Sequence, residues 1–152
     1  MKIAFVLNGS NVKVEVSPIK RLLDILQEDL GDDAMKAGCR SGECGNCLVL
    51  LDGELVNSCL VPAFRAHNRK IQTPDGLVRV KLYNEIEQGL SGLLCAFCSR
   101  STTLSIFYLL SRLPFPTEKQ IKNFLSGILC PCAGLQATFE AIQRLSSTRK
   151  TK

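Results

Sequence analysis

The sequence predicts an α+β protein made of two small units, an α+β unit over residues 1–75 and a helical unit over residues 76–152. In the first half, short aliphatic and β-branched runs alternate with turn signals, as is typical of strands. In the second half, apolar residues recur at helical spacing. Pro74 and Gly76 mark the boundary between the two patterns. When a chain of 152 residues is divided in this way, the core of each unit gives only marginal stability. Each unit therefore needs a cross-link in addition to its core.

The first unit opens with a predicted hairpin. Residues 2–7 and 12–16 form two strand-like runs, and Asn8-Gly9 between them is the strongest short signal for a tight hairpin turn. Leucines and isoleucines at helical spacing then predict an amphipathic helix over residues 22–30, which ends at Gly31. Further strands are expected at residues 48–51, 55–56 and 70–73.

The second unit is predicted to contain helices over residues 77–89, 104–113, 118–129 and 135–145. Pro114 and Pro116 force a break after the second of these helices, and Thr117 is a good N-cap for the third. Residues 146–152 are polar and basic, and we expect this tail to be disordered.

The chain contains eight cysteines. Its N-terminal apolar run is too short for a signal peptide, and the run at residues 104–110 is far shorter than the roughly 20 residues that a membrane span needs. We therefore expect a cytoplasmic protein without a membrane partner. In a reducing compartment, metal ligation explains eight cysteines better than four disulfides do.

The formal net charge is +5, which raises the question of nucleic-acid binding. The lysines and arginines are scattered and do not form one face, so we expect no nucleic-acid partner. If the eight cysteines ionised to hold two metal cores, these sites together would carry a net negative charge. That charge would largely offset the positive charge of the other side chains.

The first four cysteines form one constellation. Cys39, Cys44, Cys47 and the more distant Cys59 have the C-x4-C-x2-C spacing of a plant-type [2Fe-2S] site. Three thiolates must converge from one short segment, so its backbone has to wrap the cluster closely. Glycines at positions 38, 42 and 45 permit this approach. A four-cysteine zinc site is the alternative, but such sites usually show paired C-x2-C knuckles.

The remaining four cysteines form two close pairs, Cys95 with Cys98 and Cys130 with Cys132. Each pair precedes a predicted helix, and two helix N-termini aimed at one anionic cluster would stabilise its charge. The spacing alone leaves a second cluster, a zinc knuckle and a redox dithiol open. A redox dithiol is disfavoured because the pair lacks a βαβ setting.

The single histidine, His67, excludes a Rieske centre and a two-cysteine, two-histidine zinc site, because each needs two histidines. We expect His67 to be an exposed loop residue. No nucleophile and base stand out as a pair, and no flavin or nicotinamide fingerprint is present, so no catalytic residue is expected.

Together the two constellations resemble the small iron–sulfur subunit of the molybdenum hydroxylases, the family of xanthine dehydrogenase, aldehyde oxidase and aerobic carbon monoxide dehydrogenase. The resemblance runs over nearly the whole chain. Its most specific segments are Lys36-Ala37-Gly38-Cys39-Arg40-Ser41-Gly42-Glu43-Cys44-Gly45-Asn46-Cys47, Val56-Asn57-Ser58-Cys59-Leu60, Cys95-x2-Cys98 and Cys130-x-Cys132.

The resemblance implies a β-grasp, plant-type ferredoxin-like domain followed by an all-α four-helix domain, each with a [2Fe-2S] cluster. Molybdopterin and FAD are implied only in partner chains, a molybdopterin-binding large subunit and a FAD-binding medium subunit. Electrons would pass from molybdenum to the cluster of the helical domain, then to the ferredoxin-like cluster and then to FAD. The chain would be the electron-transfer subunit of an oxidoreductase and would have no substrate site of its own.

The sequence departs from the family pattern around the second cluster. Leu94 replaces a glutamine that contacts the pterin in the family, and Pro131 replaces an arginine. Proline offers neither a backbone N–H nor a charge, although Arg100 near Cys98 could partly restore the charge. A stand-alone or regulatory iron–sulfur protein with altered partners therefore remains an alternative function, and a structural zinc protein is a third.

Overall fold

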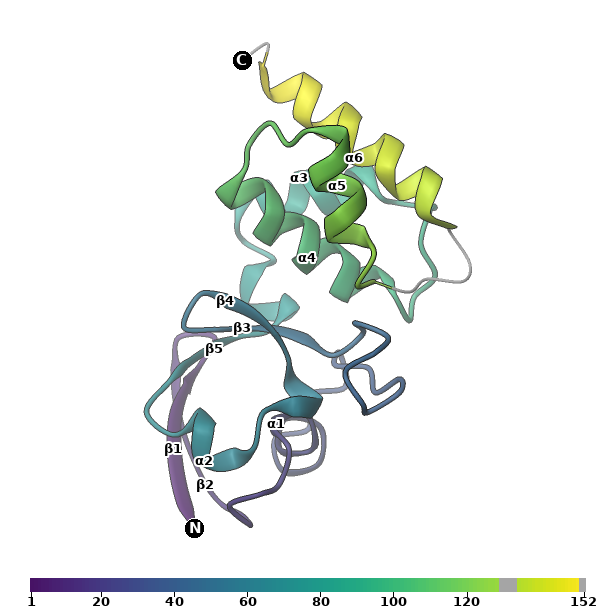
Figure 1. Ribbon diagram of the computed structural model, residues 1–152. Coiled ribbons are helices and arrows are strands. Elements are labelled where there is room, and N and C mark those ends of the chain that lie inside the picture. The colour runs from purple at the N-terminus through teal and green to yellow at the C-terminus, as the bar shows by residue number, and fades with distance from the viewer. Residues whose placement is uncertain (129–133, 151–152) are drawn as a thin grey trace.

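The computed structural model describes residues 1–128 and 134–150. The chain forms two units that stack end to end, with the N-terminus in the sheet-containing unit and the last helix, α6 (Gly134–Lys150), extending to the far end of the helical one (Figure 1). In the part of the chain that is described, no helix is both long and apolar enough to span a bilayer.

The first unit is built on a mixed five-stranded sheet with strand order β2-β1-β5-β3-β4. The strands are β1 (Lys2–Leu7), β2 (Ser10–Glu15), β3 (Leu48–Leu51), β4 (Glu54–Asn57) and β5 (Lys70–Gln72). The predicted hairpin joins β1 and β2, and its turn residues Asn8 and Gly9 have φ angles of 49° and 86°. Positive φ at both positions is what a tight hairpin turn requires. The central strands β1 and β5 run parallel, so the chain has to cross over between them.

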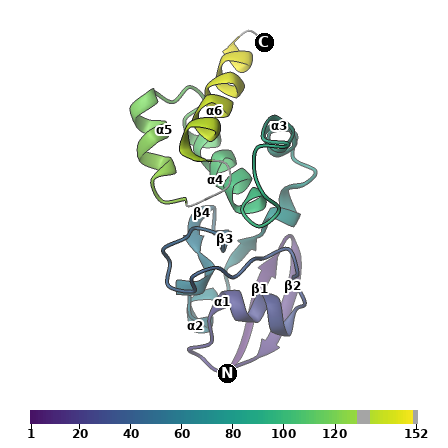
Figure 2. The ribbon, with the colours of Figure 1, turned by 90° about the vertical axis from the view of Figure 1, so that its right-hand side faces the viewer.

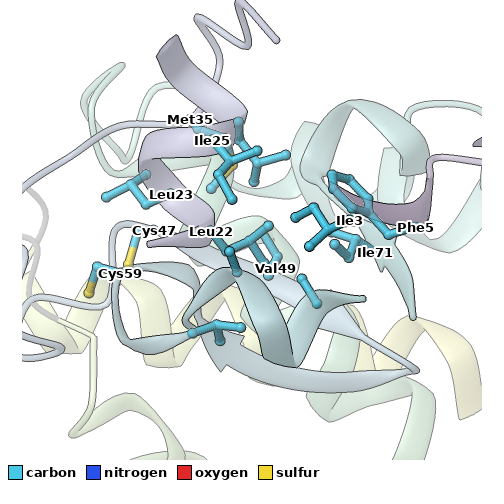
Figure 3. Packing of buried hydrophobic residues seen from close by; sticks show 14 residues of the cluster. Ile3, Phe5, Leu22, Leu23, Ile25, Met35, Cys47, Val49, Cys59 and Ile71 are labelled. Carbon is cyan, nitrogen blue, oxygen red and sulfur yellow. The ribbon is translucent and has the colours of Figure 1, made fainter. Parts of the chain in front are cut away.

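The crossover contains the predicted helix, which has two parts. α1 (Leu22–Asp24) continues as a π-helical segment, η1 (Ile25–Asp29), and the N–H of Leu30 bonds to the carbonyl of Ile25 at 3.1 Å. Gly31 ends it with a φ of 67°. The apolar face of this helix is fully buried against the sheet, as Figure 3 shows for Leu22, Ile25, Ile3 and Val49.

Two short elements between β4 and β5 were not predicted, η2 (Ser58–Leu60) and α2 (Ala63–Ala66). They bring His67 against β1, where its Nδ1 accepts a hydrogen bond of 3.0 Å from the N–H of Ala4. His67 is half-buried. His67 lies in a turn, as predicted, but the prediction that it is exposed was wrong, because a tertiary contact with β1 gives the side chain a structural role.

The second unit follows the short η3 (Pro74–Leu77) and consists of helices. They are α3 (Lys81–Gly89), α4 (Ser99–Arg112), α5 (Glu118–Leu125) and α6 (Gly134–Lys150). Thr117 caps α5 as predicted, in a capping box with Gln120. Helix α4 begins at Ser99 and not at residue 104 as predicted, because its first turn is polar and carries no apolar periodicity.

The C-terminal tail is also helical for most of its length. Helix α6 continues to Lys150, so the prediction of disorder from Ser146 onward was wrong for residues 146–150; residues 151–152 lie outside the described chain. Ser146 is buried and donates a hydrogen bond of 3.3 Å to the carbonyl of Pro114. The ammonium of Lys150 lies 5.3 Å from the ring centroid of Phe115. These contacts with the loop after α4 anchor the last turns.

A truncated chain that ends at Leu145 is expected to lose stability, because it loses both contacts. The hydrogen bond and the cation–π contact are together worth roughly 1–2 kcal/mol in the free energy of unfolding. Urea unfolding of the truncated and full-length proteins measures the difference. Ser147→Ala is the control, since Ser147 is exposed and its hydroxyl donates to the carbonyl of Gln143 in its own helix. Equal stability of the truncated and full-length chains would mean that the last turns do not hold the loop.

The two units share an apolar interface. One face of β3 packs against η3 and the helices α3 and α4, and Figure 2 shows β3 and β4 directly beneath α4. The buried residues of this interface are Leu48, Leu50, Leu77, Tyr83 and Leu104. At its edge, Glu54 accepts hydrogen bonds from Tyr108 (2.7 Å) and Arg112 (2.5 Å). The position of α4 over the sheet is therefore set by both apolar and polar contacts.

Candidate iron–sulfur sites

The segment between η1 and β3 forms a tightly curled loop that carries three of the predicted ligands. Arg40, Gly42 and Gly45 have positive φ angles of 57°, 80° and 70°, so the backbone reverses repeatedly. At Gly38 there is no room for a side chain, because a Cβ there would lie 2.6 Å from Sγ of Cys44. Glycine is therefore required in this loop, as predicted. At Gly38 a side chain would be too close to Cys44, and Gly42 and Gly45 adopt positive φ angles.

Backbone N–H groups of this loop point at sulfur. The N–H groups of Ser41, Glu43 and Cys44 lie 3.4, 3.2 and 3.3 Å from Sγ of Cys39, and the N–H of Cys39 lies 3.4 Å from Sγ of Cys44. Hydrogen bonds from the side chain of Ser41, then from its N–H and that of Cys44, lower the pKa of Cys39 to about 6. The loop therefore stabilises a thiolate, which is the form that binds metal.

Cys47 and Cys59 lie at the inner side of the loop, where both are 3% exposed. Figure 3 shows them side by side at one edge of the apolar core. Burial, and then a hydrogen bond with Cys47, raise the pKa of Cys59 to about 11. Thiolates in this position need a nearby positive charge, and a metal core would supply it.

Neighbouring polar groups hold these cysteines in place. Ser58 donates two hydrogen bonds to the carbonyl of Cys47, from its N–H at 3.0 Å and from its hydroxyl at 2.7 Å. The side chain of Asn57 lies 3.8 Å from Sγ of Cys47 and donates to the carbonyl of Gly42 at 3.4 Å. Neither residue was singled out as functional from the sequence, although they are the two residues that precede Cys59 in the chain. Such supporting contacts orient metal ligands and tune the site.

The structure thus places Cys39 against Cys44 in the loop, and Cys47 against Cys59 at its inner side. Within residues 1–128 and 134–150, however, no three His, Cys, Asp or Glu side chains are placed to bind a single metal ion. A [2Fe-2S] core divides its four thiolates between two irons, so it does not need three of them at one ion. The close backbone approach, the N–H groups aimed at sulfur and the buried thiols all fit such a core.

The structure describes two of the four cysteines of the second constellation, Cys95 and Cys98. Cys98 is the N-cap residue of α4 and is 1% exposed, whereas Cys95 is half-buried one turn before it. The N–H of Ser99 bonds to the carbonyl of Cys95, and that of Thr102 to the carbonyl of Cys98, both at 3.0 Å. The first pair therefore precedes a helix, as predicted. Cys130 and Cys132 lie outside the described residues, as does Pro131.

The structure describes the surroundings of Leu94 and Arg100, the two residues near Cys95 and Cys98 that bear on the departure from the family pattern. Leu94 is half-buried and packs against the apolar core of the helical unit. Arg100 forms an ion pair with Asp75 of η3, which raises the pKa of its guanidinium. Its charge is therefore matched by a carboxylate, and the expectation that Arg100 could replace the missing arginine charge near the second cluster is weakened.

Family models match both units. One described as a 2Fe-2S iron-sulfur cluster binding domain matches residues 5–73, and one described as a [2Fe-2S] binding domain matches residues 81–143. A nicotinate dehydrogenase subunit from Pseudomonas putida is 34% identical over 97% of this chain and 96% of its own length. The nicotinate dehydrogenase small FeS subunit of Eubacterium barkeri is 35% identical over 84% of this chain and 83% of its own length. The chain belongs to the small iron–sulfur subunits of the molybdenum hydroxylase family.

A solved structure agrees with this assignment. A chain in the crystal structure of quinoline 2-oxidoreductase from Pseudomonas putida 86 superposes with a TM-score of 0.87 at 29% sequence identity, covering 99% of this chain and 96% of that one. The predicted fold, a β-grasp domain followed by a helical domain, is confirmed. As an iron–sulfur subunit of this family, the protein is an electron-transfer component of an oxidoreductase and works with larger partner subunits.

Proposed function

We propose that this iron–sulfur subunit carries two [2Fe-2S] clusters and relays electrons from a molybdopterin-binding large subunit to a FAD-binding medium subunit in a xanthine dehydrogenase-like enzyme. The ferredoxin-like domain, residues 1–75, would bind one cluster, and the helical domain, residues 76–152, the other. The proposed ligands of the first are Cys39, Cys44, Cys47 and Cys59, and those of the second are Cys95, Cys98, Cys130 and Cys132. We place the protein in the cytoplasm.

The observation that carries this proposal is the glycine loop whose backbone N–H groups converge on Sγ of Cys39. When bound, a [2Fe-2S] cluster accepts and releases one electron. The loop's own contribution is electrostatic, since N–H groups next to thiolates favour additional negative charge. Cys47 and Cys59 are buried at the inner side of the same site, whereas Cys39 is exposed. In the helical domain, Cys98 at the start of α4 lies at the positive end of that helix.

Chemical analysis of the anaerobically purified protein tests the proposal. We expect about four iron and four inorganic sulfide per chain, because each of the two four-cysteine sites would take a two-iron core. Reduction should produce two distinguishable paramagnetic signals, since one site is in a glycine loop and the other is at a helix start. Stoichiometric zinc without sulfide would contradict the proposal and favour a structural zinc protein.

The partners can be tested separately. Relatives named as subunits support larger partner chains, and molybdopterin and FAD are proposed only in them. Co-expression with a molybdopterin-binding and a FAD-binding subunit encoded nearby should yield one complex that contains all three chains. A chain that holds four irons and binds neither subunit would instead support the stand-alone or regulatory function.

A further inference from the structure

Helix α4 buries four hydroxyl groups near its start. Ser101, Thr102, Thr103 and Ser105 are all at most 4% exposed. A buried hydroxyl costs free energy unless it is hydrogen-bonded. Ser105 meets this need within its own helix, through a bond of 2.8 Å to the carbonyl of Thr102. The hydroxyl of Ser101 instead reaches the other domain and donates a hydrogen bond of 2.7 Å to the carbonyl of Asn46.

The two ends of this bond are close to both proposed cluster sites. Ser101 lies in the first turn of α4, three residues after Cys98, and Asn46 immediately precedes Cys47. Asn46 is itself 4% exposed, so the bond is shielded from water. A continuous path through the first turn of α4, this hydrogen bond and the peptide between Asn46 and Cys47 therefore connects a proposed ligand of one cluster to a proposed ligand of the other.

The contacts around the bond hold it in place. Next to Asn46, the backbone at Gly45 is so close to the helical domain that a Cβ there would lie 2.7 Å from the carbonyl oxygen of Gly127. Next to Ser101, Arg100 pairs with Asp75 of η3. The cysteine loop thus touches the helical domain on one side of the bond, and the ion pair with η3 holds the start of α4 on the other.

We infer that Ser101 is a positioning residue that couples the two cluster-binding loops electronically, through its hydrogen bond to the carbonyl of Asn46. This inference rests on the proposed function. Electron tunnelling weakens steeply with distance, and it is stronger through covalent and hydrogen bonds than across gaps. The bond also polarises the peptide between Asn46 and Cys47, since hydrogen bonds strengthen one another in a buried setting. A hydroxyl with only a structural role would contribute stability but no coupling.

Two alanine variants of the full-length protein with its clusters separate these roles. Ser101→Ala removes the bond between the domains, whereas Ser105→Ala removes a buried hydroxyl bond within the same helix. Alanine is a good helix former, so both variants should fold and retain iron and sulfide. The readout is the magnetic interaction between the two clusters, measured by electron paramagnetic resonance after full reduction. We expect a weaker interaction in Ser101→Ala and the wild-type interaction in Ser105→Ala.

A third variant tests rescue. Ser101→Thr keeps the hydroxyl and should restore most of the interaction. An unchanged interaction in Ser101→Ala, or an equal loss in Ser105→Ala, would overturn the inference. Loss of the helical-domain cluster in Ser101→Ala alone would also overturn it, since the hydroxyl would then be needed to build the site.

If the wild type shows two signals without any interaction, the coupling is absent although the proposed function stands. A wild type that lacks two cluster signals would contradict the proposed function itself.

Discussion

Cys44→Ser is expected to unfold much of the ferredoxin-like domain and to leave most of the helical domain intact, whereas Cys98→Ser should do the reverse. Each domain has a small core, and the binding free energy of a metal site becomes folding free energy in small domains. We therefore expect a loss of at least about 3 kcal/mol in the stability of the affected domain. Hydrogen exchange read segment by segment measures this loss, and each variant is the control for the other.

The shared interface limits how cleanly the two effects separate. Leu48 and Leu50 of β3 pack in the same buried group as Tyr83 and Leu104 of the helical domain. Segments at this interface should lose protection in both variants, while the β1–β2 hairpin and α6 should respond to only one of them. Native-like protection throughout both variants would show that the clusters do not stabilise the domains.

Gly45→Ala is expected to disturb the contact between the two domains and to destabilise the protein by about 2–5 kcal/mol. Alanine at a φ of 70° costs roughly 1–2 kcal/mol. The new Cβ would also lie 2.7 Å from the carbonyl oxygen of Gly127, and crowding of this kind typically costs about 1–3 kcal/mol. Denaturant unfolding measures the total change in stability.

Gly53→Ala is the matched control for this prediction. Gly53 has a φ of 85°, but no atom lies within 4 Å of the position that its Cβ would take. The control should therefore show the conformational cost of about 1–2 kcal/mol without the crowding. If the two variants lose the same stability, the close approach of Gly45 to Gly127 contributes nothing to domain packing.

Features that depend on local chemistry could be predicted from the sequence. Asn8-Gly9 forms the hairpin turn because both residues accept a positive φ, and Thr117 caps α5 because its side chain lies next to the free N–H groups it satisfies. The loop around Cys39 belongs to the same group, since the spacing of its cysteines and glycines already requires the chain to curl.

Features that depend on distant contacts could not be predicted. The last turns of α6 are polar and are held by Pro114 and Phe115, far away in sequence. His67 is fixed by the N–H of Ala4, and periodicity carries no information about such a contact. The same holds for the bond from Ser101 to Asn46, which exists only because the two domains dock in one particular way.

The depth of three proposed ligands bears on how the protein is assembled in the cell. Cys47, Cys59 and Cys98 are almost completely buried, and the loop around Cys39 is packed against residues 127 and 128. Iron and sulfide would have difficulty reaching these thiols once both domains are closed. Cofactor insertion would therefore have to precede final docking or use a transient opening of the domain interface. The finished protein would then exchange its metal only slowly.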